Sequence, residues 1–245
     1  HYDTHNWDTI KVPGSWQMQG YDQAQYCNVR YPWEGSEDIC PPNAPTKHNP
    51  VGCYVKKIQI DKSLLNKRVV ICFEGVESAF YLYINGERIG YSESTFHRSE
   101  FDISRYIKEA SNVIGVEVYR WCTASWLECQ DMWRLSGIER DVYLYSTPKQ
   151  YIADYKLNAS LEKEKYKDGI FGLEVTVEGH SAISGATSIA YTLKDANGKA
   201  VLQDAIRIKS RGLSNLITFD RKNLPDVKAW SAEHPHLYTL ILELK

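Results

Sequence analysis

Ile114-Gly115-Val116-Glu117-Val118-Tyr119 decides the fold class, because apolar residues occupy every second position of this stretch. Successive side chains of a strand point to opposite faces, so the alternation predicts a strand with one buried face. The same spacing recurs at Ile58 and Ile60, and from Phe171 through Leu173 and Val175 to Val177. We therefore expect an all-β protein.

Turn signals support this expectation. Asn85-Gly86 follows the apolar run 79–84, and Asn197-Gly198 follows the run 189–193. Asn-Gly between two strand patterns is typical of a tight hairpin. Only residues 102–109 have a helical pattern, with Asp102 as a possible N-cap, and a helix there would have only about two turns.

The composition excludes several classes of protein. The 245 residues contain 29 Lys and Arg against 31 Asp and Glu, without a run of like charge, so nucleic acid and anionic membranes are not expected partners. The longest apolar runs are far shorter than the roughly 20 residues that cross a bilayer. Six cysteines form neither a CxxC pair nor a Cys/His zinc spacing. We favour free thiols, since Cys72 lies in the apolar run 69–73.

The length favours two domains. Composition changes from Trp-rich to Lys/Glu-rich around Ser146-Thr147-Pro148, so we place domains at 1–148 and 149–245. Six of the seven Trp residues precede this boundary, which assigns any aromatic binding surface to the first domain. The second domain has about the length of an immunoglobulin-type sandwich and is interpreted as scaffold. The chain has neither an initiator Met nor a leader pattern, so we expect it to be processed or cut from a longer polypeptide, and its compartment is not indicated.

Two polar clusters and one long loop are candidates for function. Residues 31–50 contain five prolines and do not fit a regular strand, and loops of this length are commonly functional. Asn28 lies between Tyr26 and Tyr31, a combination that suits a sugar hydroxyl and its apolar C–H face, although an Asn that satisfies a loop backbone is the commoner case.

The second cluster follows one strand pattern and precedes another. Its carboxylates allow acid/base work, cation binding or simple ion pairing, and from composition alone ion pairing is favoured. The cluster consists of Glu128, Asp131, Glu139 and Asp141 among Arg120, Arg134 and Arg140.

Several motifs resemble, in order, the N-terminal region of the large bacterial β-galactosidases of glycoside hydrolase family 2. The resemblance covers nearly the whole chain. The motifs are Gly14-Ser15-Trp16-Gln17-Met18, Asn28-Val29-Arg30-Tyr31-Pro32, Asn49-Pro50-Val51-Gly52-Cys53-Tyr54, Gln130-Asp131-Met132-Trp133-Arg134-Leu135-Ser136-Gly137-Ile138 and Arg140-Asp141-Val142.

The resemblance implies a jelly-roll sugar-binding domain over 1–148 and an immunoglobulin-like sandwich over 149–245, truncated at the outer end of each. In the family a (β/α)8 barrel follows and carries two glutamates that cleave β-galactosides with retention. Neither glutamate matches a position of this chain, so we expect the chain alone to be inactive.

The resemblance also assigns two residues to the rim of the substrate site. Asn28 matches an Asn that contacts the galactosyl group, and Asp131 matches an Asp that binds sugar and a sodium ion; both flanking motifs are intact. The implied partners are a β-galactoside, the barrel and further copies of the whole enzyme. A magnesium ion is implied elsewhere, without ligands here. Glu128, Glu139, Asp141, Arg134 and Arg140 are interpreted as structural, and Trp16, Trp121, Trp126 and Trp133 as core or domain-contact residues.

Three alternatives stay open. A separate carbohydrate-binding module requires a group of solvent-exposed aromatic residues. A purely structural or oligomerisation role predicts that Asn28 and Asp131 lie too far apart to share a ligand. The equivalent part of a β-glucuronidase or β-mannosidase would have the same domain order, although the motifs around Asn28 and Asp131 resemble those of galactosidases.

Overall fold

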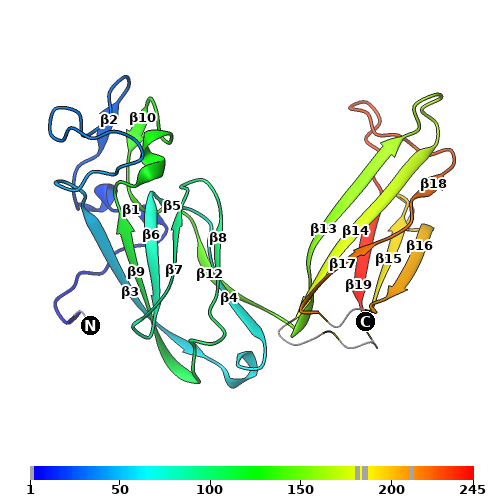
Figure 1. The fold of residues 1–245 in the computed structure, drawn as a ribbon, viewed down its shortest axis with the longest axis horizontal. Helices are drawn as coiled ribbons and strands as arrows, with labels where there is room; N and C mark the ends of the chain where they lie inside the picture. The colour runs from blue at the N-terminus through cyan, green and yellow to red at the C-terminus, as the bar shows by residue number, and fades with distance from the viewer. Residues whose placement is uncertain (1–2, 180–182, 184–186, 210–211) are drawn as a thin grey trace. The chain divides into compact units, whose positions relative to one another are not determined.

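The computed structural model of the chain describes residues 3–179, 183, 187–209 and 212–245 (Figure 1). In this part of the chain the regular elements are strands and short 3-10 turns, which confirms the all-β prediction. Contacts divide the chain into two compact units, His1–Ser146 and Thr147–Lys245. No helix among the described residues has the length and apolar character that a membrane crossing requires.

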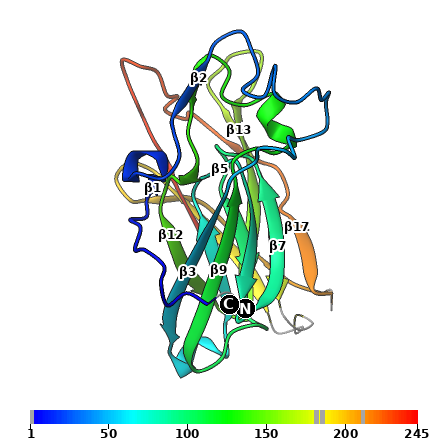
Figure 2. The same ribbon diagram turned by 90° about the vertical axis from the view of Figure 1, so that its left-hand side faces the viewer.

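The first unit is a sandwich of a sheet in the order β3-β9-β6-β7 and a sheet in the order β12-β4-β8. Figure 2 shows the first of these sheets toward the viewer. Two small sheets, β1-β11-β5 and β10-β2, lie at one end of the unit. The strands are β1 (Gly14–Ser15), β2 (Gln25–Cys27), β3 (Val51–Ile60), β4 (Arg68–Phe73), β5 (Val76–Glu77), β6 (Ala79–Ile84), β7 (Glu87–Glu93), β8 (Ser99–Asp102), β9 (Ala110–Tyr119), β10 (Met132–Arg134), β11 (Gly137–Ile138) and β12 (Val142–Thr147).

Alternation builds the core of this unit. Val116 of β9 pairs directly with Leu82 of β6, and both side chains are buried against Phe73 of β4 and its neighbours. Each such side chain contributes about 1.5–3 kcal/mol when it is removed from water. The hairpin between β6 and β7 turns at Asn85 and Gly86, which have φ angles of 52° and 87°, as the Asn-Gly signal predicts.

The second unit has a sheet in the order β13-β14-β17, to which β18 is added, and a sheet in the order β16-β15-β19. Leu173 and Val175 of β14 are buried with Tyr191 of β15 in a core of their own. The arrangement is an immunoglobulin-like sandwich, as expected. The strands are β13 (Gln150–Leu161), β14 (Gly169–Gly179), β15 (Ser188–Lys194), β16 (Ala200–Arg207), β17 (Ser214–Thr218), β18 (Lys222–Leu224) and β19 (Thr239–Leu244).

The predicted helix at 102–109 is wrong. Asp102 ends β8, and its Oδ1 accepts hydrogen bonds from the backbone N and Oγ of Ser104, which closes a turn instead of a helix. The buried Asn112 side chain then pairs with both the N–H and the carbonyl of Lys108. These side chains satisfy the backbone groups that a helix would use, so a second helical turn does not form.

The long loop at 31–50 wraps around a small aromatic core of its own. Trp33 is buried against Trp121 and Trp126, with ring centroids 5.6 and 4.9 Å away. Asn49 fixes the far end of the loop, because its side chain bonds both the N–H and the carbonyl of Trp121 at 2.9 Å. The loop is therefore held in place by its own small core, next to the strands β2 and β10.

Candidate functional site

The two residues assigned to the rim of the site lie at the same end of one short ladder. Strand β2 pairs antiparallel with β10, with Cys27 opposite Met132 and Tyr26 opposite Trp133. Asn28 is the next residue after this ladder on one strand, and Asp131 is the residue before it on the other. Both are exposed. The register therefore brings together two positions that are 103 residues apart in sequence (131 − 28).

A hydrogen bond ties Asp131 to the neighbouring strand. The hydroxyl of Tyr26 donates to Oδ1 of Asp131 at 2.5 Å. This bond, made to the carboxylate, raises the pKa of Tyr26, because loss of the phenolic proton would remove the donor. Asp131 has a φ of 53°, which is uncommon for a residue with a side chain but tolerated by Asp. The carboxylate thus has a defined position despite its exposure.

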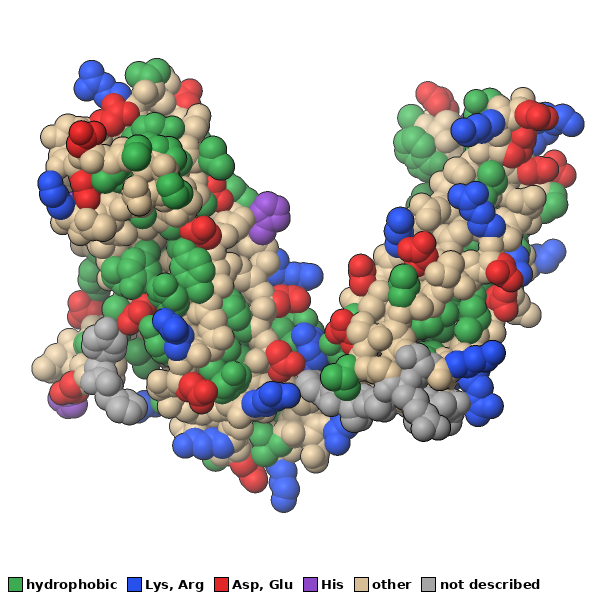
Figure 3. Space-filling view, viewed as in Figure 1, with side chains coloured by type: hydrophobic (Ala, Val, Ile, Leu, Met, Phe, Trp, Pro, Cys, Tyr) green, Lys and Arg blue, Asp and Glu red, His purple; other side chains and the backbone are tan. Residues whose placement is uncertain are grey.

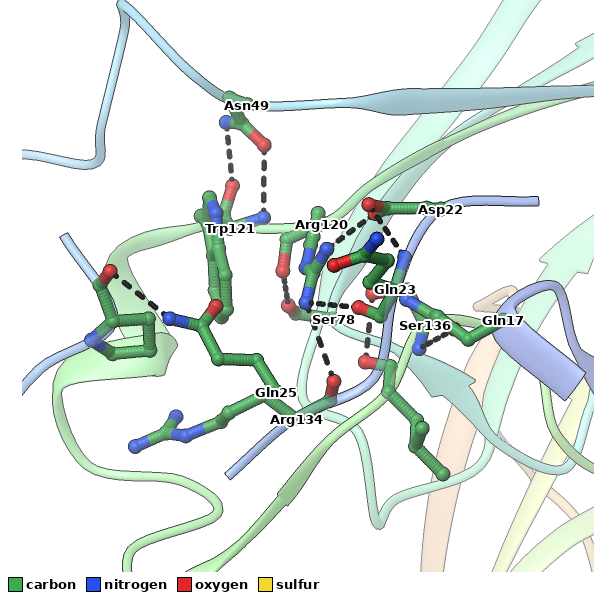
Figure 4. A network of polar contacts seen from close by, with 12 residues as sticks. Gln17, Asp22, Gln23, Gln25, Asn49, Ser78, Arg120, Trp121, Arg134 and Ser136 are labelled. Atoms are coloured by element: carbon green, nitrogen blue, oxygen red, sulfur yellow. Dashed lines mark hydrogen bonds and ion pairs between the residues drawn. The ribbon is translucent and has the colours of Figure 1, made fainter. Parts of the chain in front are cut away.

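A buried arginine is bonded to segments of both strands or next to them (Figure 4). Arg120 is 3% exposed, forms an ion pair with Asp22 and donates to the carbonyls of Gln23 and Arg134 at 3.0 and 3.5 Å. One contact precedes β2 and another is the last residue of β10. Because a buried charge is costly unless it is paired, this network holds both strands in one arrangement.

The segment that leads into Asp131 depends on a second buried arginine. Arg134 donates to the carbonyls of Ser125 and Glu128 at 3.3 and 2.7 Å. The Glu128 carboxylate accepts from the backbone N and the hydroxyl of Thr95. The structural roles expected for Arg134 and Glu128 are consistent with these contacts, since both side chains bind within the protein.

Glu77 is the most perturbed carboxyl group near the site. Desolvation raises its pKa to about 7, and its Oε1 lies 3.3 Å from the Sγ of Cys129. Burial likewise raises the pKa of the Cys129 thiol to about 12. Glu139 is also largely buried, and burial raises its pKa. These groups are largely buried, whereas Asn28 and Asp131 are exposed. We therefore do not assign them a contact with the ligand.

The tryptophans separate into buried and exposed groups. Trp16, Trp121 and Trp126 are buried, as expected for core residues. Trp133 is 60% exposed, so the core interpretation is wrong for it, whereas a contact with another domain stays a prediction. Its ring lies 5.7 Å from that of Tyr26 at an interplanar angle of 52°. Trp133 and Tyr26 are thus exposed next to each other, whereas Trp16, Trp121 and Trp126 are buried and add nothing to an exposed aromatic group.

In the described part of the chain, few donor atoms for a sodium ion lie near Asp131. Among the described residues, no group of three or more His, Cys, Asp and Glu side chains is arranged to hold a metal ion. Oδ1 of Asp131 is bonded to Tyr26, and Oδ2 offers one hard oxygen. Asp131 therefore fits one ligand position of a sodium site. It does not form a complete site by itself.

Sequence reasoning missed the hydrogen bond of Tyr26 to Asp131 and the ion pair of Arg120 with Asp22. Tyr26 precedes Asn28 by two positions, and Trp133 follows Asp131 by two. This period-two relation is a signal for one shared strand face. It is weak because β2 and β10 have three residues each, too few for an alternation to be recognised.

Two family models match the chain in succession. Residues 2–148 match "Glycosyl hydrolases family 2, sugar binding domain", and residues 150–245 match "Glycosyl hydrolases family 2". The first match covers more than half of the chain.

Curated relatives and solved structures agree with these matches. A β-galactosidase of Priestia megaterium is 47% identical over 240 residues, which are 98% of this chain and 23% of the relative. A β-galactosidase of Clostridium acetobutylicum is 43% identical over 96% of this chain and 25% of its own length. The chain thus spans about a quarter of these relatives. The structure of Bacteroides uniformis β-glucuronidase 2 covers all of this chain, at a TM-score of 0.76 and 16% identity, and 28% of that protein aligns; at this identity the likeness shows the fold alone.

Proposed function

The chain belongs to glycosyl hydrolase family 2, and from this premise we propose that it forms the sugar-binding and immunoglobulin-like domains of a longer retaining β-galactosidase. Relatives that are 40–47% identical over nearly all of the chain are named β-galactosidases, which supports the galactoside as substrate class.

The ladder of β2 and β10 carries the proposal, because it brings Asn28 and Asp131 to one exposed end. The amide of Asn28 both donates and accepts, so it pairs with a sugar hydroxyl in either sense. Oδ2 of Asp131 accepts from a second hydroxyl and binds a sodium ion, which neutralises the carboxylate next to the sugar. Such a contact increases kcat only if it is stronger in the transition state than in the bound substrate.

We propose that the residues that cleave the glycosidic bond belong to another part of the longer enzyme. A retaining mechanism needs two carboxyl groups about 5–5.5 Å apart, one as acid/base and one as nucleophile. We assign both to a barrel that follows in the longer enzyme. Residues 1–245 alone are expected to be inactive toward β-galactosides.

The surface around the rim supports contact with such a barrel. Three apolar side chains near Asn28 and Asp131 are exposed: Val29 is 88%, Leu127 82% and Met132 50% accessible. Figure 3 shows hydrophobic side chains on the surface at this end of the first unit, while acidic and basic groups are mixed over the face in view. Exposed apolar groups beside polar ligands are typical of a surface that another domain covers.

The test measures hydrolysis of a chromogenic β-galactoside by the complete enzyme that carries this chain. We expect Asn28→Ala and Asp131→Ala each to lower kcat/KM by about tenfold or more, because each leaves a sugar hydroxyl or its partner unpaired. The sodium concentration for half-maximal activity rises in Asp131→Ala and is unchanged in Asn28→Ala.

Asn66→Ala and Glu87→Ala are matched controls, since both residues are exposed in the first unit away from the ladder and from the loop at 31–50. The four variants are compared at equal folded fraction. Kinetics of Asn28→Ala and Asp131→Ala equal to those of the controls would leave these domains as scaffold. A preference for a β-glucuronide or β-mannoside over the galactoside would contradict the substrate class.

A further inference from the structure

Asp131 is exposed, yet its carboxylate is held by a specific partner. The Tyr26 hydroxyl donates to Oδ1 at 2.5 Å, although Tyr26 is itself 51% exposed. An exposed carboxylate without a partner rotates freely about its side-chain bonds, and its ordering costs free energy when a ligand binds. This bond removes part of that cost before binding.

Tyr26 is suited to hold the Asp131 carboxylate because the position of its own ring is restrained. Register places Tyr26 opposite Trp133, and the two rings lie 5.7 Å apart. The buried Arg120 binds the carbonyls of Gln23 and Arg134, which fixes both strands. A tyrosine has only two side-chain torsions, so it offers a rigid donor at little entropic cost.

Asp131 needs such a partner because of its backbone. Its φ of 53° and the φ of 55° at Cys129 mark a segment with two left-handed residues just before β10. Ladder pairing begins only at Met132, so no pairing with β2 restrains Asp131 itself. Without the phenol, the orientation of the carboxylate would depend on this short irregular segment.

We infer that Tyr26 is a positioning residue of the sugar site: by holding Oδ1 of Asp131, it directs Oδ2 toward the ligand. The inference rests on the proposed function of Asp131. It adds a role for a residue that does not have to touch the sugar itself. Its effect must therefore pass through Asp131, which a double-mutant cycle measures.

The experiment measures binding of isopropyl thio-β-galactoside to the complete enzyme by calorimetry, for wild type, Tyr26→Phe, Asp131→Ala and the double variant. Phe keeps the ring beside Trp133 and removes only the donor. We expect Tyr26→Phe to weaken binding about fivefold, the size of one net hydrogen bond. In the Asp131→Ala background the same change is expected to have no effect.

Tyr91→Phe is the matched control, because Tyr91 is also exposed and its hydroxyl donates to a carboxylate, Glu93, at 2.9 Å on β7. We expect it to bind like wild type. Thermal unfolding of each variant establishes that the compared proteins are folded.

Each outcome decides between the two claims. Wild-type binding by Asp131→Ala would overturn the proposed function itself. A loss in Asp131→Ala together with wild-type binding by Tyr26→Phe would overturn only the positioning role. Additive losses in the double variant would also overturn it, since Tyr26 would then act independently of Asp131.

Discussion

At the scale of single residues, the polar side chains of the candidate site differ in the number of protein partners that fix their position. Asp131 is oriented by one phenol, whereas the buried Arg120 has an ion pair and two carbonyl partners. Water supplies the other partners of an exposed group, whereas a buried group depends on the protein, and even Arg120 leaves its buried Nε without a partner. This contrast separates the binding residues from the residues that support them.

Glu77 gives a prediction about pH. Its pKa in the folded protein is about 7, against 4.5 for the free side chain, because desolvation opposes its charge. The folded state therefore holds a proton that the unfolded state releases between these values, so the stability contribution is complete below pH 4.5 and is lost as the pH rises through 7. The loss is at most about 3 kcal/mol.

We expect Glu77→Gln to flatten this part of the pH dependence and to raise the free energy of unfolding at pH 8. Urea unfolding at pH 5 and pH 8 measures both changes. Glu87→Gln on the exposed part of β7 is the control and should follow wild type. Equal pH dependence in Glu77→Gln and wild type would show that Glu77 is charged in the folded protein.

At the scale of elements, sequence patterns predicted strands that have one regularly buried face and missed strands without one, such as β2, β10 and the long but largely exposed β13. Residues 114–118 of β9 and 171–177 of β14 were recognised, because one buried face forces strict alternation. β2 and β10 were not, since three residues with polar and aromatic side chains carry no clear period. The helix predicted at 102–109 is wrong for another reason. The side chains of Asp102 and Asn112 bind backbone groups there, and a local sequence pattern does not reveal such bonds.

The candidate residues show the same limit. Asn28 and Asp131 came from motif resemblance, and local spacing did not indicate that they share one ladder. Tyr26 was noticed only as a neighbour of Asn28, because its bond to Asp131 joins residues 105 positions apart. Trp133 was interpreted from its residue type as a core or domain-contact residue; the core role is wrong, because its side chain is exposed, and the domain contact stays a prediction.

The loop at 31–50 gives a prediction at this scale. Asn49→Ala removes two hydrogen bonds to the backbone of Trp121 and leaves those groups unpaired. We expect a loss of about 1–3 kcal/mol in the free energy of unfolding and faster proteolysis within the loop. Asn66→Ala, at an exposed position, should change neither. Unaltered proteolysis in Asn49→Ala would mean that the aromatic core alone holds the loop.

At the scale of the whole molecule, each unit has a complete set of core contacts of its own. Leu82 is buried only in the first core and Leu173 only in the second. We expect Leu82→Ala and Leu173→Ala each to cost about 2–5 kcal/mol and to lower a different one of two calorimetric transitions. A single transition lowered equally by both variants would show that the units unfold together.

The ladder of β2 and β10 has a further consequence for biosynthesis. The contact between Tyr26 and Asp131 joins positions 105 residues apart. A ribosome adds about 5–20 residues per second, so Asn28 and Tyr26 emerge roughly 5–20 s before the segment that completes their site. During that interval the nascent β2 has exposed aromatic groups and no partner strand. Such a pairing is non-local, so chain-closure entropy opposes it, and we expect the ladder that carries the candidate site to form late in folding.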